Sequence, residues 1–147
     1  MIKKNQEVMK NILYAVETGG QVYGKHNYAS LIGAGHNTSN EVAITIGAGQ
    51  WYATEAKTLL NKILSKYPKE FKSMDTAGIQ SDLTSKNWSK YSISVGSDKA
   101  KCIVKIISSE VGIKCQDELM LEQINTYSEE ITKTYGRDGD SFFTSYC

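Results

Sequence analysis

The spacing of apolar residues predicts that most of this chain is helical. Val8, Ile12 and Ala15 recur at intervals of four and three residues, the repeat of one face of an α-helix. They predict a first helix over residues 2–17. The pair Gly19-Gly20 is expected to end it, because glycine readily adopts the left-handed conformation of a helix C-cap.

Further helical patterns follow in the second half of the chain. An apolar stripe begins at residue 52 and ends near Pro68, and short helices and turns are expected around Trp88 and Tyr91. Ser97 is a candidate N-cap for a helix that Gly112 closes, and a last long helix is predicted over about 116–134.

Between these helices the pattern changes to that of β-strands. Residues 28–32 and 41–46 are short strand candidates, separated by the turn-rich stretch 33–40. In the second strand Val42, Ile44 and Ile46 alternate with Glu41, Ala43 and Thr45. We expect the first three to face the core and the other three to face a cleft. The predicted fold class is therefore α+β and mostly α, one domain over 1–147 with a small hairpin inserted after the first helix.

Composition narrows the possible functions. The chain has 147 residues, enough for one domain, and 17 basic against 16 acidic residues. This balance argues against a nucleic-acid or polybasic membrane module. No apolar run reaches the roughly 20 residues of a membrane span, and no signal peptide is visible. No cysteine or histidine pattern suggests a metal, and no cofactor is expected. The thiols are expected to be reduced, with a Cys102–Cys115 bridge left open.

Glu17 is the most interesting ionisable residue in the pattern. It lies at the predicted end of the first helix, beside Ala15 and Val16, where packing on the core would desolvate its carboxyl group. Desolvation and the negative end of the helix dipole both favour the protonated form, which a general acid needs. The alternative is that Glu17 is an ordinary solvated residue at a helix end.

Two motifs give Glu17 a context. The stretch 17–24 reads Glu-Thr-Gly-Gly-Gln-Val-Tyr-Gly, and the stretch 44–52 reads Ile-Thr-Ile-Gly-Ala-Gly-Gln-Trp-Tyr. With these motifs the chain resembles the lysozyme-like superfamily of peptidoglycan hydrolases. Within that superfamily it is most similar to the glycosidase domain of endolysins from phages of clostridia and related Gram-positive bacteria. Residues 12–64 contain the specific part of the resemblance, and residues 65–147 match loosely.

The resemblance implies a lysozyme-like fold and a bacterial peptidoglycan substrate. It implies cleavage of the β-1,4 glycosidic bond between N-acetylmuramic acid and N-acetylglucosamine, by a muramidase, a glucosaminidase or a lytic transglycosylase. It also implies residence in the host cytoplasm before lysis and action at the cell wall afterwards. Domains of this group continue past the position of Cys147, so a further C-terminal segment or a partner chain is expected to complete the cleft.

The residues suggest how this chemistry would be divided. Glu17 would protonate the leaving oxygen, Glu41 would act as nucleophile, base or electrostatic stabiliser, and Thr45 would position a water molecule. Candidate sugar-binding residues are the aromatic and turn residues near the expected cleft: Tyr23, Tyr28, Gly47, Gln50, Trp51 and Tyr52.

Each of these assignments has a plainer alternative. Glu41 can be a solvated turn residue, Thr45 an ordinary strand residue, and Gln50 a cap of the following helix. The aromatic residues can simply pack. The alternative for the whole chain is a non-catalytic lysozyme-fold protein that binds cell-wall glycan or a partner protein in the same groove. A thiol hydrolase is disfavoured because no cysteine lies in a recognisable nucleophile motif.

Overall fold

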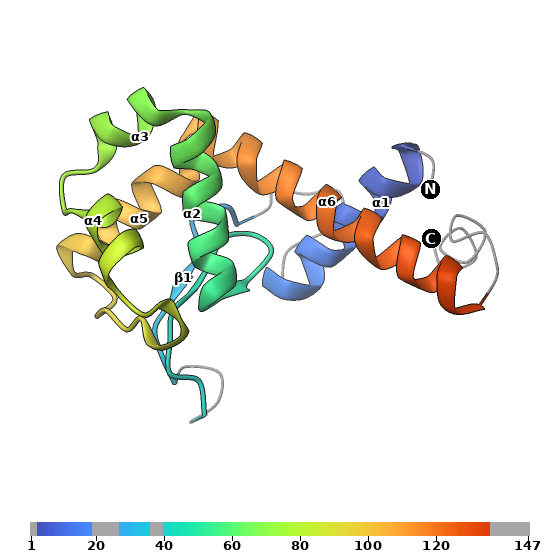
Figure 1. Ribbon diagram of the computed structural model, residues 1–147, viewed down its shortest axis with the longest axis horizontal. Coiled ribbons are helices and arrows are strands. Elements are labelled where there is room, and N and C mark those ends of the chain that lie inside the picture. Colours follow the sequence, from blue (N-terminus) through green and yellow to red (C-terminus); the bar gives the residue numbers. More distant parts are fainter. Residues whose placement is uncertain (1–2, 19–26, 36–39, 136–147) are drawn as a thin grey trace. The chain divides into compact units, whose positions relative to one another are not determined.

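The structure is a computed structural model, and it describes residues 3–18, 27–35 and 40–135, with side chains at positions 5–13, 27–35 and 40–126. The chain divides into two compact units (Figure 1). The first contains Met1–His26 and Asp117–Cys147, and the second contains Asn27–Gln116.

The first unit is helical where it is described. It contains α1 (Lys3–Thr18) and the part of α6 (Glu110–Tyr135) that begins at Asp117. The predicted helices over 2–17 and about 116–134 are thus confirmed, although α6 begins earlier than expected. Polar contacts hold the two helices together, because Gln6 donates a hydrogen bond to Asn125.

Lys10 provides a second contact between α1 and α6. Its ammonium group is nearly buried, 3.0 Å from a carboxylate oxygen of Glu7 and 3.7 Å from one of Asp117. Because residue 6 pairs with residue 125 and residue 10 with residue 117, the two helices run antiparallel.

The second unit contains a small sheet and a group of short helices. Its elements are β1 (Leu31–Ile32), β2 (Thr45–Ile46), β3 (Trp51–Tyr52), α2 (Thr54–Lys66), α3 (Pro68–Met74), α4 (Ile79–Ser85), the 3-10 helix η1 (Trp88–Lys90), α5 (Asp98–Ser108) and the first turns of α6. Helix α2 packs against α3, α4, β3 and η1 (Figure 1). The predicted α+β class, mostly helical with a small antiparallel sheet, is confirmed.

The sheet has one strand more than the pattern predicts. Its order is β1-β2-β3 and both pairings are antiparallel, with Ile46 opposite both Leu31 and Trp51. Trp51 and Tyr52 were expected to lead into the next helix, but they form β3 and the helix begins only at Thr54. The reason is the tight turn at residues 47–50, which reverses the chain immediately after β2.

The predicted alternation around β2 is wrong. Val42, expected in the core, is 49% exposed, whereas Ala43, Ile44, Thr45 and Ile46 are all buried. A strand at the centre of a small sheet can be covered on both faces, and here the backbone N–H of Ile44 also donates to the carbonyl oxygen of Tyr91. Burial on both faces removes the polar face that the alternation predicted.

The boundary between α5 and α6 also differs from the prediction. Ser97 caps α5 as expected, since its side chain accepts from the backbone N–H of Ala100. The break follows at Ser109 and not at Gly112, because the Ser109 side chain accepts from the N–H of Gly112 and so caps α6. Gly112 lies inside α6, pressed against the carbonyl oxygen of Ile106.

Two predictions from composition can be compared with the structure. Cys102 and Cys115 are buried free thiols, so the bridge between them is not formed, while Cys147 lies outside the described residues. Among the described residues, no helix combines the length and the apolar character that a membrane span requires.

Candidate functional site

Glu17 lies in the last turn of α1, one residue before the end of the helix at Thr18. The predicted position at a helix end is therefore confirmed for its backbone. Its side chain lies outside the described residues, as does all of Tyr23. Glu17 belongs to the first unit and Glu41 to the second, so the approach of the two carboxyl groups stays a prediction.

Glu41 is half-buried before β2, and one of its carboxylate oxygens is in an unusual state. Oε2 is shut off from solvent and has no hydrogen-bond partner among the described residues. A buried polar atom without a partner costs folding free energy, so such atoms are rare in folded proteins. Oε2 therefore keeps an unused capacity to accept a hydrogen bond, but a ligand reaches it only when the groups that cover it move.

Tyr52 positions the backbone next to Glu41. Its hydroxyl oxygen lies 2.9 Å from the backbone nitrogen of Val42 and accepts a hydrogen bond from it. This bond ties the end of β3 to the residue that follows Glu41. The ring of Tyr52 is half-buried, which leaves part of it accessible to a ligand.

Thr45 and Trp51, two other predicted site residues, are core residues in the structure. Thr45 is 4% exposed and Trp51 is 1% exposed. Thr45 therefore does not face an open cleft as the alternation predicted. The ring of Trp51 packs beside Gly47, where an added Cβ would lie 2.8 Å from ring atom Cε3. This packing leaves no face of the Trp51 ring for a sugar.

Gly47 and Gln50 form the turn between β2 and β3. Gly47 has φ +79°, which glycine adopts without strain, and Gln50 has φ +51°. The Gln50 amide donates to the Ser30 hydroxyl and to the Gly47 carbonyl oxygen, both at 3.0 Å. Gln50 therefore holds its own turn. Ala53, the N-cap residue of α2, also has a positive φ, and such strained positions cluster at functional sites.

Gln116 was missed as a site residue, although it holds this turn in place. It is fully buried, and its Oε1 accepts from the backbone N–H of Ala48 at 2.8 Å. Its Nε2 donates to the carbonyl oxygens of Tyr28 and Ile107, each at 2.9 Å. One amide thus joins α6 to the turn, to the half-buried Tyr28 segment and to α5. The sequence signal that could have identified Gln116 is its position four residues after Gly112, on the buried face of the helix.

A second cluster of ionisable groups lies between α4 and α5. Asp82 is buried, and its Oδ2 accepts from the Tyr91 hydroxyl at 2.6 Å and from the Lys99 ammonium at 2.7 Å. Burial raises the pKa of Asp82, but hydrogen bonds from Lys99 and Tyr91 lower it by more, so the pKa lies below its ordinary value. Burial and the Asp82 carboxylate together raise the pKa of Tyr91.

This cluster predicts a loss of stability in alkali. The unfolded chain loses the phenol proton near pH 10, whereas the folded chain keeps it on Tyr91, so the free energy of unfolding falls as pH rises above that value. The fall is up to about 1.4 kcal/mol per pH unit. We expect urea unfolding between pH 8 and pH 11 to show a steeper decline for wild type than for Tyr91→Phe. Equal slopes for the two proteins would contradict this assignment.

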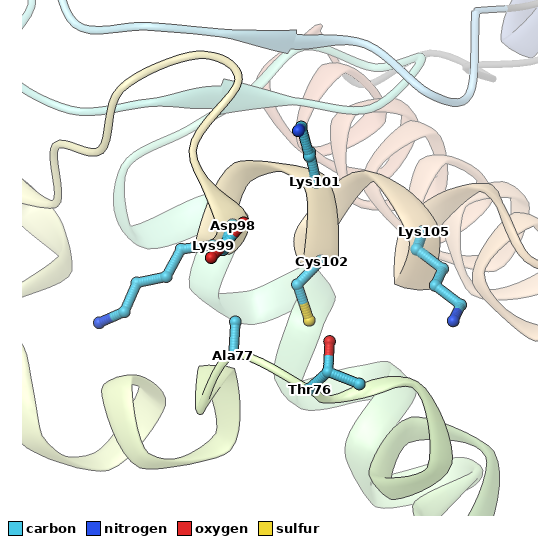
Figure 2. Close-up of a pocket in the computed structure, with 7 residues that line it drawn as sticks. All are labelled: Thr76, Ala77, Asp98, Lys99, Lys101, Cys102 and Lys105. Carbon is cyan, nitrogen blue, oxygen red and sulfur yellow. The ribbon is translucent and has the colours of Figure 1, made fainter.

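A cavity of about 510 Å³ lies between α5 and the loop that joins α3 to α4. Figure 2 shows that Lys101 points away from the Cys102 thiol, and that the side chains of Lys99 and Lys105 extend in opposite directions. The three ammonium groups therefore do not converge on one ligand position. Cys102 is buried and its Sγ lies 3.4 Å from the carbonyl oxygen of Met74. We assign no chemistry to this cavity.

Neither a metal site among the described residues nor a known relative indicates a function for this chain. Within the described ranges, no group of three or more histidine, cysteine, aspartate or glutamate residues is arranged to hold a metal ion. Comparison of the chain with models of protein families, with curated proteins and with solved structures finds no match. A functional assignment therefore depends on the residues of the chain itself.

Proposed function

We propose that this chain is a peptidoglycan hydrolase of lysozyme-like fold, a phage endolysin, that cleaves the β-1,4 glycosidic bond between N-acetylmuramic acid and N-acetylglucosamine. The observation that supports it most is the buried, unpartnered Oε2 of Glu41, which leaves a carboxylate free beside the sheet. A second carboxylate, Glu17, follows from the motif at the end of α1.

Two carboxyl groups are what glycoside hydrolysis requires. Glu17 is the general acid, which protonates the leaving oxygen as the glycosidic bond breaks. Glu41 either accepts a proton from the attacking water or attacks the anomeric carbon directly. A separation of about 5–5.5 Å between the carboxyl groups corresponds to retention of configuration, and about 6.5–9.5 Å to inversion. Either route requires the groups that cover Oε2 to move, or it uses the other carboxylate oxygen, Oε1.

The half-buried aromatic residues in and around the hairpin suit the binding of a sugar chain. Tyr52 holds the residue after Glu41 while part of its ring stays accessible, whereas Gly47, in the turn between β2 and β3, is buried against the Trp51 ring and Gln116. Tyr28 is half-buried in the segment that Gln116 ties to the same turn. Tyr28 and Tyr52, together with Tyr23, are the aromatic residues that we assign to sugar contacts.

The proposal predicts soluble glycan fragments from Gram-positive cell walls. Purified walls incubated with wild-type protein should release muropeptides, and mass spectrometry should identify their ends. A reducing muramic end indicates a muramidase, a reducing glucosamine end a glucosaminidase, and a 1,6-anhydro end a lytic transglycosylase.

Wall preparations incubated without protein are the control for that experiment. Protein that sediments with the walls but releases no fragments would contradict hydrolysis and would indicate the non-catalytic, glycan-binding alternative. Protein that neither sediments with the walls nor releases fragments would contradict both readings.

A further inference from the structure

Positive charge is concentrated in the second unit. Asn27–Gln116 contains eleven lysines against seven aspartates and glutamates, a formal charge of +4, whereas the rest of the chain is at −3. The near-neutral total of +1 therefore hides a strongly basic unit. Basic surfaces attract anionic ligands, so a cavity of this unit where lysines gather is a candidate anion site.

One cavity of about 400 Å³, beside η1, meets that description. It is lined mainly by residues that offer N–H or O–H donors: Lys86, Asn87, Lys90, Tyr91, Ser92 and Lys99. Asp82 is the only carboxylate among its lining residues. Three ammonium groups against one carboxylate give the lining a formal charge of +2.

The Asp82 carboxylate organises this cavity instead of neutralising it. Its Oδ2 holds Lys99 at 2.7 Å, which fixes one ammonium group in the wall and occupies one of its three protons. Lys86 and Lys90 are exposed, and neither forms an ion pair with another residue that the structure describes. At least two full positive charges therefore remain available to a ligand.

The chemistry of the donors indicates which anion fits. Lysine ammonium groups bind phosphate as point charges, and a phosphate group offers more negative charge and more acceptor oxygens than a carboxylate. The sole arginine of the chain, Arg137, lies outside the described residues, so this cavity relies on lysine. Its volume leaves room for a polyol or a sugar attached to the phosphate.

We propose that the cavity formed by Lys86, Lys90 and Lys99 binds a phosphate group, either a phosphomonoester or a phosphodiester of an anionic polymer. Glu41 is not among its lining residues, and the proposal does not depend on the proposed hydrolase activity. Bound phosphate would accept hydrogen bonds from the ammonium groups and from the Ser92 hydroxyl on the same wall.

Binding can be measured by NMR titration of the ¹⁵N-labelled full chain at low salt. The probes are inorganic phosphate, glycerol 3-phosphate and oligo(glycerol phosphate), with acetate as the carboxylate control. We expect saturable shifts at the amides of residues 86–93 with the phosphates and much weaker shifts with acetate. Tightest binding of glycerol 3-phosphate identifies a monoester site, and tightest binding of the oligomer identifies a polymer site.

Two double variants with the same loss of charge test the location. Lys86→Gln/Lys90→Gln should weaken phosphate binding by about tenfold or more, because charge-assisted hydrogen bonds are lost. Lys69→Gln/Lys72→Gln, two exposed lysines of α3 outside the cavity, should change the affinity by less than about twofold.

Equal weakening in the two double variants, or no saturable shift in wild type, would overturn the proposal. The Glu17→Gln variant should bind phosphate like wild type, so this result stands apart from any failure of the hydrolase proposal. All of these substitutions, apart from Glu17→Gln, lie on exposed side chains, so the variants are expected to fold.

Discussion

Glu17→Gln is expected to lower the rate of muropeptide release by about 10²–10⁴-fold, the range by which a general acid accelerates a reaction. Glutamine has nearly the same size as glutamate but cannot donate a carboxyl proton to the leaving oxygen. The rate is measured from the soluble fragments released by purified Gram-positive walls, and circular dichroism checks that the variant stays helical.

Two further glutamate-to-glutamine substitutions make the comparison specific. Glu41→Gln is expected to slow the same reaction, because it replaces the free Oε2 carboxylate with a neutral amide. Glu55→Gln is the matched control, since Glu55 is exposed in the first turn of α2 and should leave the rate unchanged. A Glu17→Gln protein with the activity of wild type would remove Glu17 from the mechanism.

Gly112→Ala is expected to destabilise the protein by about 3 kcal/mol or more, at the upper end of the cost of overpacking. Its new Cβ would lie 2.2 Å from the carbonyl oxygen of Ile106 and 2.4 Å from that of Ile107. These are backbone atoms, so α5 and α6 would have to move apart. Helix propensity alone predicts the opposite sign, because alanine stabilises a helix interior by about 1 kcal/mol relative to glycine.

Urea denaturation measures this effect. Gly33→Ala is the control, since its added Cβ would meet only Val95 Cγ2 at 3.4 Å, an ordinary contact. We expect that variant to remain within about 1 kcal/mol of wild type. A Gly112→Ala protein as stable as wild type would show that the two helices do not cross closely at this point.

Features that depend on neighbouring residues in the sequence were predictable. Apolar spacing of three and four residues located both ends of α1, α2 and α5, and the C-terminal end of α6, to within a few residues. Ser97 marked the start of α5. Ser109 was missed as the boundary of α6 because Gly112 is the stronger stop signal in sequence. Glycine here serves close packing between helices, a need that only the tertiary structure reveals.

The strands were less predictable because their environment comes from distant parts of the chain. Alternation places Val42 and Ile44 on one face, but Ile44 is covered by contact with Tyr91 while Val42 is left exposed. In β3, Trp51 and Tyr52 precede a strong helical stripe, which hides the reversal at residues 47–50. Local pattern cannot show which segments will cover a two-residue strand.

The candidate site also contains some features that local sequence predicts and others that depend on distant parts of the chain. The position of Glu17 at the end of α1 follows from local signals, and Glu41 was identified as a possible second carboxylate from its place beside the hairpin. The unpartnered state of Glu41 Oε2 could not be predicted, because it depends on all the groups packed around that oxygen. Gln116 was missed since its partners Ala48 and Tyr28 are 68 and 88 residues away.

The long reach of Gln116 has a consequence for the order in which the protein can be synthesised and folded. A ribosome makes β1, β2 and β3 well before it adds Gln116, and strands of two residues each are too short to hold a sheet by themselves. Contacts of such high sequence separation form late in folding. The turn between β2 and β3 is therefore expected to stay open on the nascent chain until α6 emerges and Gln116 closes it.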